Sequence, residues 1–113
     1  MLLSCHILAR AFARHFPQLI CLDGHYTKIV NHSWLYWKDP KRGRGWIIDV
    51  YPVATYPAPL LVDCALPTAF IRLYVHGSEA RGLAELCQTE SFQRAVDRLA
   101  AEIERLLLQT STP

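Results

Sequence analysis

The chain has 113 residues, a formal net charge of +2 and an apolar fraction of 51%. This length suits one domain, and the apolar content excludes a disordered chain. So small a charge does not indicate a nucleic-acid partner, and no stretch is apolar for long enough to cross a bilayer. We therefore predict a single domain over residues 1–113, with no membrane partner and no nucleic acid.

The first predicted element is a helix over residues 4–15. Ser4 is a suitable N-cap, and Pro17 ends the helix. Polar residues recur at every fourth position, opposite an apolar stripe that we expect to face the core. The polar stripe consists of His6, Arg10 and Arg14, and the apolar stripe of Cys5, Leu8, Ala9, Phe12 and Phe16. Cys5 therefore lies in the first helical turn, on the side expected to be buried.

Runs rich in β-branched and aromatic residues predict the strands that follow. We expect a short strand at 19–22, a turn at Asp23-Gly24, and longer strands at 28–37 and 45–50 joined by the hairpin loop "KDPKRGRG". Residues 51–67 contain four prolines and are predicted to form an irregular crossing segment. A further strand is expected at 69–75.

Two helices are predicted at the C-terminal end. Ser78 would cap a short helix that runs to about Leu86, and Thr89 or Ser91 would start the last helix. The apolar stripe of that helix is Phe92, Val96, Leu99, Ile103 and Leu106. We interpret it as core packing, with a homodimer seam as the alternative. The predicted fold class is α+β: an N-terminal helix packed on a small, mostly antiparallel sheet, with two C-terminal helices.

The predicted hairpin gives a candidate pair of catalytic groups. If the loop is centred between Pro40 and Lys41, His32 and Asp49 are equally far from that centre and face each other on one side of the sheet. A carboxylate there would accept a hydrogen bond from the imidazole and favour its charged form. A register shift of one residue would place the two side chains on opposite faces.

Cys5 adds a nucleophile to this pair. The first turn of a helix carries a partial positive charge that lowers the pKa of a thiol. A thiolate, an imidazole and a carboxylate are the groups that cysteine enzymes use for acyl transfer. The backbone amide of Cys5 is then a natural donor to an oxyanion.

The segments "SCH", "HSWLYW" and "IIDVYP" resemble papain-like and transglutaminase-like cysteine proteases over residues 4–52. The chain order Cys, His, Asp is most similar to the transglutaminase-like arrangement. The resemblance implies the core of that fold, a triad of Cys5, His32 and Asp49, and hydrolysis of an amide, peptide or isopeptide bond in a peptide or protein substrate. It implies neither a cofactor nor a metal.

The source of a second oxyanion donor is open, because only four residues precede Cys5 and the local papain signature is absent. The candidates for substrate or oxyanion contacts are Asn31, Ser33 and Trp34, or a loop amide. Trp34 shares the predicted face of His32 and would shield the ion pair from water. Adjacent helical residues point about 100° apart, so His6 is expected to face away from Cys5, and His25 is expected to lie near solvent.

Other interpretations remain open. The four cysteines are widely spaced and form no C-x-x-C pair, which predicts reduced thiols and a cytoplasmic location. The basic, acid-free N-terminal stretch is also typical of a transit peptide. Cys21 and His25, joined by Cys5, His6 or His32, are the ligands of an alternative zinc site. The alternative function is a non-catalytic binding or inhibitor protein that engages a partner through the basic hairpin 38–45 and the proline-rich segment 51–63.

Overall fold

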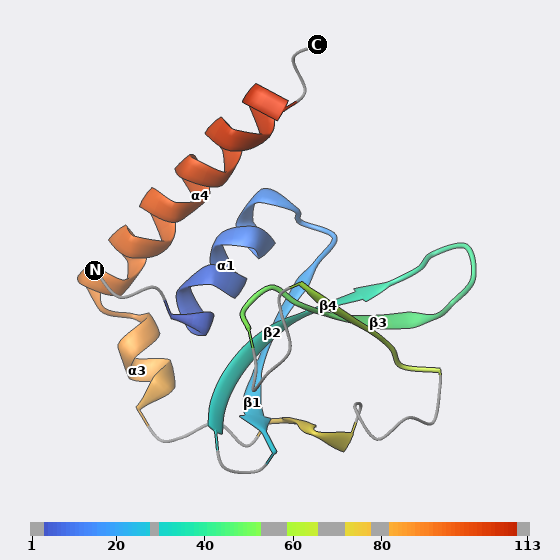
Figure 1. Ribbon diagram of the computed structural model, residues 1–113. Coiled ribbons are helices and arrows are strands. Elements are labelled where there is room, and N and C mark those ends of the chain that lie inside the picture. The colour runs from blue at the N-terminus through green and yellow to red at the C-terminus, as the bar shows by residue number, and fades with distance from the viewer. Residues whose placement is uncertain (1–3, 28–29, 53–58, 66–71, 78–81, 111–113) are drawn as a thin grey trace.

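The computed structural model of the chain describes residues 4–27, 30–52, 59–65, 72–77 and 82–110, and within them it has the α+β fold expected from the sequence. The antiparallel sheet has the strand order β4-β3-β2-β1-β5 (Figure 1). The elements are α1 (Cys5–His15), β1 (Ile20–Tyr26), β2 (Val30–Lys38), β3 (Gly45–Asp49), β4 (Leu60–Asp63), β5 (Tyr74–His76), α3 (Leu83–Cys87) and α4 (Glu90–Thr110).

Helix α1 begins and ends close to where the sequence predicts. The hydroxyl of Ser4 accepts a hydrogen bond from the Ile7 amide at 3.2 Å, which satisfies one of the amides that the first turn leaves unpaired. Ala9 and Ala11 project about 200° apart on the helix, yet both are fully buried. The helix is therefore covered on two opposite sides, and Figure 1 shows it between the sheet and α4.

The sheet differs from the prediction in three places. β1 continues through Asp23-Gly24, where a turn was expected, and β4 lies inside the segment predicted to be irregular. Of the strand predicted at 69–75, residues 66–71 lie outside the described part of the chain, and among residues 72–75 only Tyr74 and Val75 belong to β5. A Cβ added to Gly24 would lie 1.9 Å from the carbonyl oxygen of Val75, so this glycine permits the close approach of β5.

The hairpin register is two residues away from the predicted one. Leu35 pairs with Ile48 and Lys38 with Gly45, so the loop is centred between Lys41 and Arg42. Continuing this register would set Asp49 opposite Trp34, and the prediction that it directly opposes His32 is wrong. Because side chains alternate with a period of two, the shift still leaves His32 and Asp49 on the same face.

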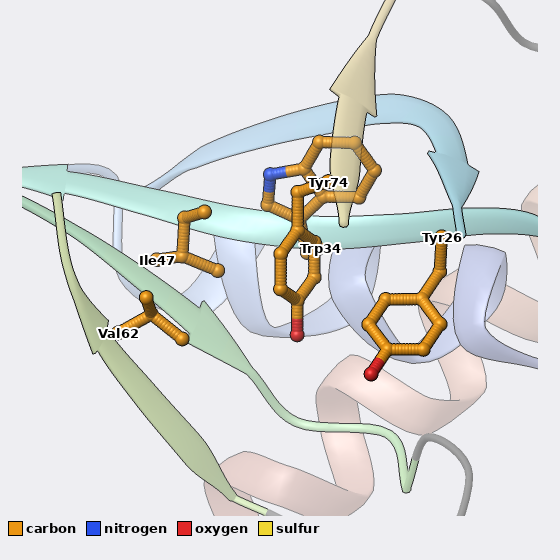
Figure 2. Close-up of a cluster of buried hydrophobic side chains, with 5 residues drawn as sticks. All are labelled: Tyr26, Trp34, Ile47, Val62 and Tyr74. Carbon is orange, nitrogen blue, oxygen red and sulfur yellow. The ribbon is translucent and has the colours of Figure 1, made fainter. Parts of the chain in front are cut away.

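That face carries the main buried cluster of the described sheet. Figure 2 shows Trp34 beside Tyr74, with Tyr26 to one side and Ile47 and Val62 to the other. The rings of Tyr26 and Trp34 both meet the ring of Tyr74 edge-on at 5.2 Å between centroids. The opposite face of β2 carries Ser33 and Leu35, which are almost completely buried, and β2 packs against α1.

The two C-terminal helices are present, but α3 differs from the prediction in where it begins. Ser78 lies outside the described residues, and α3 begins after Gly82 rather than at Ser78. At the start of α4 the Thr89 hydroxyl accepts the Phe92 amide at 3.3 Å, as the sequence predicts. In the apolar stripe of α4, Phe92, Val96 and Ile103 are buried and Leu99 is half-buried, whereas Leu106 is 47% exposed. Among the described helices, none has both the length and the apolar character needed to cross a membrane.

Candidate active site

His32 and Asp49 form a buried ion pair. His32 Nε2 lies 2.7 Å from Asp49 Oδ2, and the two residues are 2% and 0% exposed. The Tyr74 hydroxyl donates to the same carboxylate oxygen at 2.8 Å, and the Tyr51 amide donates to Oδ1 at 3.3 Å. Both oxygens of the buried carboxylate are thus satisfied, and Nδ1 is the nitrogen of His32 that stays available for another partner.

Aromatic rings surround the imidazole of His32. Trp34 stacks on it with 6.1 Å between centroids and an interplanar angle of 23°. Tyr26, Tyr51 and Tyr74 approach it at 6.2, 6.5 and 6.3 Å. These rings keep water away from the His32–Asp49 pair, and a lower local dielectric strengthens the attraction between the two charges.

Cys5 is the first residue of α1 and is half-buried. Burial acts to raise the pKa of its thiol. Hydrogen bonding to the rings of His32 and His6 and to the Ser33 backbone, together with the charge of His6, outweighs burial and lowers the pKa to about 6. An ordinary cysteine is mostly protonated at neutral pH, so this environment converts Cys5 into a thiolate.

The pKa of His32 moves in the opposite direction. Burial acts to lower it, but the hydrogen bonds and charges of Asp49 and Cys5 raise it to about 9. Between about pH 6 and pH 9 the dominant species is therefore a Cys5 thiolate beside a His32 imidazolium. The structure thus brings together the three residues that the sequence proposes as a triad.

A second polar network adjoins Cys5 and is formed by His6, Arg10, Asp23 and Ser33. His6 Nδ1 lies 2.6 Å from Ser33 Oγ, and Ser33 Oγ donates its proton to Asp23. Arg10 Nη2 binds the other Asp23 oxygen at 2.7 Å, and Arg10 Nη1 contacts Ser33 Oγ at 3.4 Å. Burial acts to raise the pKa of Asp23, but the hydrogen bonds from Arg10 and Ser33 hold it below its ordinary value.

The proton directions in this network follow from its chemistry. An ionised carboxylate only accepts, so the single hydroxyl proton of Ser33 belongs to Asp23. The Ser33 oxygen must then accept from His6, which places a proton on Nδ1 of His6. Nε2 is therefore the nitrogen of His6 that can interact with the Cys5 sulfur.

The prediction that His6 faces away from Cys5 is wrong. A helical wheel gives the 100° between the two side chains, but it does not show which directions the fold covers. Because α1 lies between the sheet and α4, the N-terminal part of its polar stripe is enclosed as well. There His6 contacts Ser33 and Arg10 contacts Asp23, both of the sheet. The spacing of four between His6 and Arg10 was the available signal, since it places both on one helical face.

The predicted oxyanion residues occupy different positions around the site. The Ser33 hydroxyl is committed to Asp23, whereas its backbone contacts Cys5. Trp34 stacks on His32. Asn31 lies opposite His25 in the β1–β2 pair, and its role as a donor stays a prediction. Tyr74 was not anticipated, because it comes from a strand that is distant in the sequence.

The alternative zinc site is not assembled in the described residues. No group of three or more His, Cys, Asp or Glu side chains within those ranges is arranged to hold a metal ion. Burial raises the pKa of Cys21 to about 12. A thiol in that state is a poor metal ligand, because thiolate is the form that binds.

No family model, curated protein or solved structure matches this chain. The function is therefore inferred from the residues of the site itself.

The second network gives a testable role to Ser33. Ser33→Ala removes the acceptor that orients His6 while leaving His6, His32 and Cys5 in place. We expect the midpoint of the pH dependence of Cys5 alkylation to rise by about one unit, because His6 is no longer fixed beside the Cys5 sulfur, where its charge favours the thiolate. Glu104→Ala, at an exposed position on α4, is the control and should leave the midpoint unchanged. An unchanged midpoint in Ser33→Ala would mean that His6 needs no such support.

Proposed function

We propose that this protein is a thiol hydrolase of an amide, peptide or isopeptide bond, of the papain-like or transglutaminase-like class. Cys5 is the nucleophile, His32 the general acid and base, and Asp49 the residue that orients His32. The observation that carries the proposal is the buried His32–Asp49 ion pair with the Cys5 thiol beside its imidazole, an arrangement that favours a thiolate and an imidazolium at neutral pH.

In the first half of the reaction, the Cys5 sulfur attacks the carbonyl carbon and a C–S bond forms. His32 then gives its Nδ1 proton to the leaving nitrogen as the C–N bond breaks, and the amine departs. The product on the protein is a thioester. Asp49 holds Nε2, so Nδ1 stays directed to the reacting atoms throughout.

In the second half, water replaces the departed amine. His32, now neutral, takes a proton from the water as its oxygen attacks the thioester carbonyl. The C–S bond breaks, the carboxylic acid leaves, and the proton held by His32 restores the imidazolium beside the thiolate. No other reactant is required.

The oxyanion that develops in both halves needs hydrogen-bond donors. Ser4 occupies the amide of Ile7 through its hydroxyl and that of Leu8 through its carbonyl. The amides of Cys5 and His6 precede these in the first turn, where a helix offers no internal acceptor. The Cys5 amide is therefore the first donor of the proposed oxyanion hole, and the positive end of α1 adds to its effect.

The alternative, a binding or inhibitor protein that acts through hairpin 38–45, has less support. Arg44 of that loop pairs with the buried Asp63 at 3.1 Å. Asp39 accepts the backbone amide of Lys41 at 2.9 Å and so shapes the turn. Part of the loop's charge and polarity thus serves the hairpin itself, although Lys41 and Arg42 are exposed.

An activated ester separates the two functions. With p-nitrophenyl acetate we expect a burst of one p-nitrophenolate per chain, followed by slow turnover, and one acetyl group on Cys5 by mass spectrometry. Cys5→Ala should abolish both phases, whereas Cys64→Ala, which removes a half-buried thiol just after β4, should leave them intact. A burst that persists in Cys5→Ala would favour the binding protein.

A further inference from the structure

A hollow of about 370 Å³ lies beside the N-terminus of α1, where α3 and α4 meet it. Ser4 and His6, the residues on either side of Cys5 in the chain, form one part of its wall. We call it the His6 hollow. The apolar part of its lining consists of Ile7, Leu86, Phe92 and Ala95.

Its position links the hollow to the nucleophile. His6 lines it and also interacts with the Cys5 sulfur. Phe92 in its wall lies under the guanidinium of Arg10, 5.7 Å from the ring centroid, and Arg10 in turn binds Asp23. The network that orients His6 therefore also holds one wall of the hollow, so a group seated there would be positioned relative to the thiolate.

A larger hollow of about 450 Å³ lies at the other end of α1, lined by residues such as Phe12, Phe16 and Leu61. Among the described residues of its lining there is no member of the Cys5–His32–Asp49 triad and none of the His6 network. It is the roomier of the two, but it is at the wrong end of the helix for a substrate group attached to the reacting carbonyl.

We propose that the His6 hollow is the subsite for an apolar side chain of the acyl donor, of aromatic or large aliphatic character. This inference rests on the proposed function, because it assumes that Cys5 attacks a carbonyl. A dry cavity of about 150 Å³ accepts a benzene ring, so the hollow has room for such a side chain. Among the described residues of its lining, the imidazole of His6 is the one group that can carry a charge, and no carboxylate or ammonium group is present.

Two alkylating reagents test the inference without a known substrate. Iodoacetamide reports the reactivity of Cys5 alone, and N-benzyliodoacetamide adds a ring that can enter the hollow. Relative to their rates with glutathione, we expect the benzyl reagent to label Cys5 about tenfold faster than iodoacetamide, as burial of an aromatic ring predicts.

Two variants should make the hollow unsuitable for an aromatic ring, one by adding a charge and one by filling the space. Leu86 is 49% exposed, so Leu86→Asp adds a carboxylate at the edge without disturbing the core, and Leu108→Asp at a 65% exposed position is its matched control. Leu86→Asp should abolish the benzyl preference, Leu108→Asp should keep it, and iodoacetamide should react equally with both. Ala95→Phe, which fills the hollow, should have the effect of Leu86→Asp.

The outcomes distinguish this inference from the proposed function. Slow labelling of Cys5 by both reagents in the wild type contradicts the proposed function, and the inference falls with it. Fast labelling without a benzyl preference, or a preference that survives in Leu86→Asp, overturns the inference alone.

Discussion

His32→Ala should slow the alkylation of Cys5 at pH 6 by about 20-fold. In the wild type about half of Cys5 is thiolate at that pH, whereas about one in a thousand molecules of a thiol with a pKa near 9 is ionised. The wild type thus has far more thiolate at pH 6, but its thiolate is less basic and therefore less nucleophilic. Because nucleophilicity follows pKa with a slope of about 0.4–0.5, this reduces the rate advantage by a factor of about 20. Without His32, burial of the thiol is less strongly opposed and its pKa returns toward the ordinary value.

The measurement is the alkylation rate of each cysteine as a function of pH, followed by mass spectrometry. In the wild type the Cys5 rate should rise through about pH 6, well below the point at which Cys21, Cys64 and Cys87 react, because burial raises the pKa of all three. With anionic iodoacetate the rate should fall again through about pH 9, as His32 loses its proton. Neutral iodoacetamide should lack that fall.

His15→Ala is the control for this experiment, since it removes an imidazole from the far end of the same helix. It should leave the Cys5 profile unchanged. If Cys5 reacts no faster than the other three cysteines at pH 6, or if His32→Ala leaves its profile as it was, the thiolate–imidazolium pair does not exist in solution.

Asp49→Ala should destabilise the protein by about 3–5 kcal/mol, because it leaves a buried imidazolium without its counter-charge. It also leaves the Tyr74 hydroxyl without its acceptor in a buried position. Denaturant unfolding gives the loss of stability. The same variant should slow Cys5 alkylation at pH 6, since His32 would no longer be held in its charged form.

The difference in stability between wild type and Asp49→Ala should depend on pH in a defined direction. Burial acts to lower the pKa of His32, but Asp49 and Cys5 raise it from 6.5 in the unfolded chain to about 9 in the folded one. Stabilisation by the charged ring is thus fully present below pH 6.5 and is lost as the pH rises through 9. The gap between the two proteins should therefore be widest at and below pH 6.5 and narrower above pH 9.

Asp63→Ala is the matched control, because Asp63 is also a buried carboxylate in an ion pair, with Arg44. It should reduce stability while leaving Cys5 reactivity unchanged. If Asp49→Ala resembled Asp63→Ala in both measurements, Asp49 would have a structural role only.

Local signals in the sequence account for the elements that were predicted well. The Ser4 cap and Pro17 set the ends of α1, and Thr89 sets the start of α4. The hairpin was correct in kind but not in register, because Asp39 binds the loop backbone and shifts the centre of the turn by one residue. His32 and Asp49 are not directly opposite as predicted, but they are still in contact, because the offset of two residues keeps both on the same sheet face.

Contacts between distant segments account for what the sequence did not reveal. His6 meets Ser33 of the sheet because α1 is enclosed between the sheet and α4, and the spacing of His6 and Arg10 does not by itself reveal that packing. Tyr74 reaches Asp49 because β5 pairs with β1, although the two residues are 25 positions apart. Periodicity describes one element at a time, so a site assembled from four elements exceeds what it can predict.

The closeness of Gly24 to β5 gives the site a dependence on a residue that takes no part in it. β5 is three residues long and, among the described strands, it pairs with β1 alone. One methyl group at position 24 would act as a wedge against Val75 and push this short strand outward, carrying Tyr74 with it. Tyr74 donates to the Asp49 carboxylate that holds His32. The geometry of that carboxylate thus depends on the absence of a Cβ atom at Gly24 of β1.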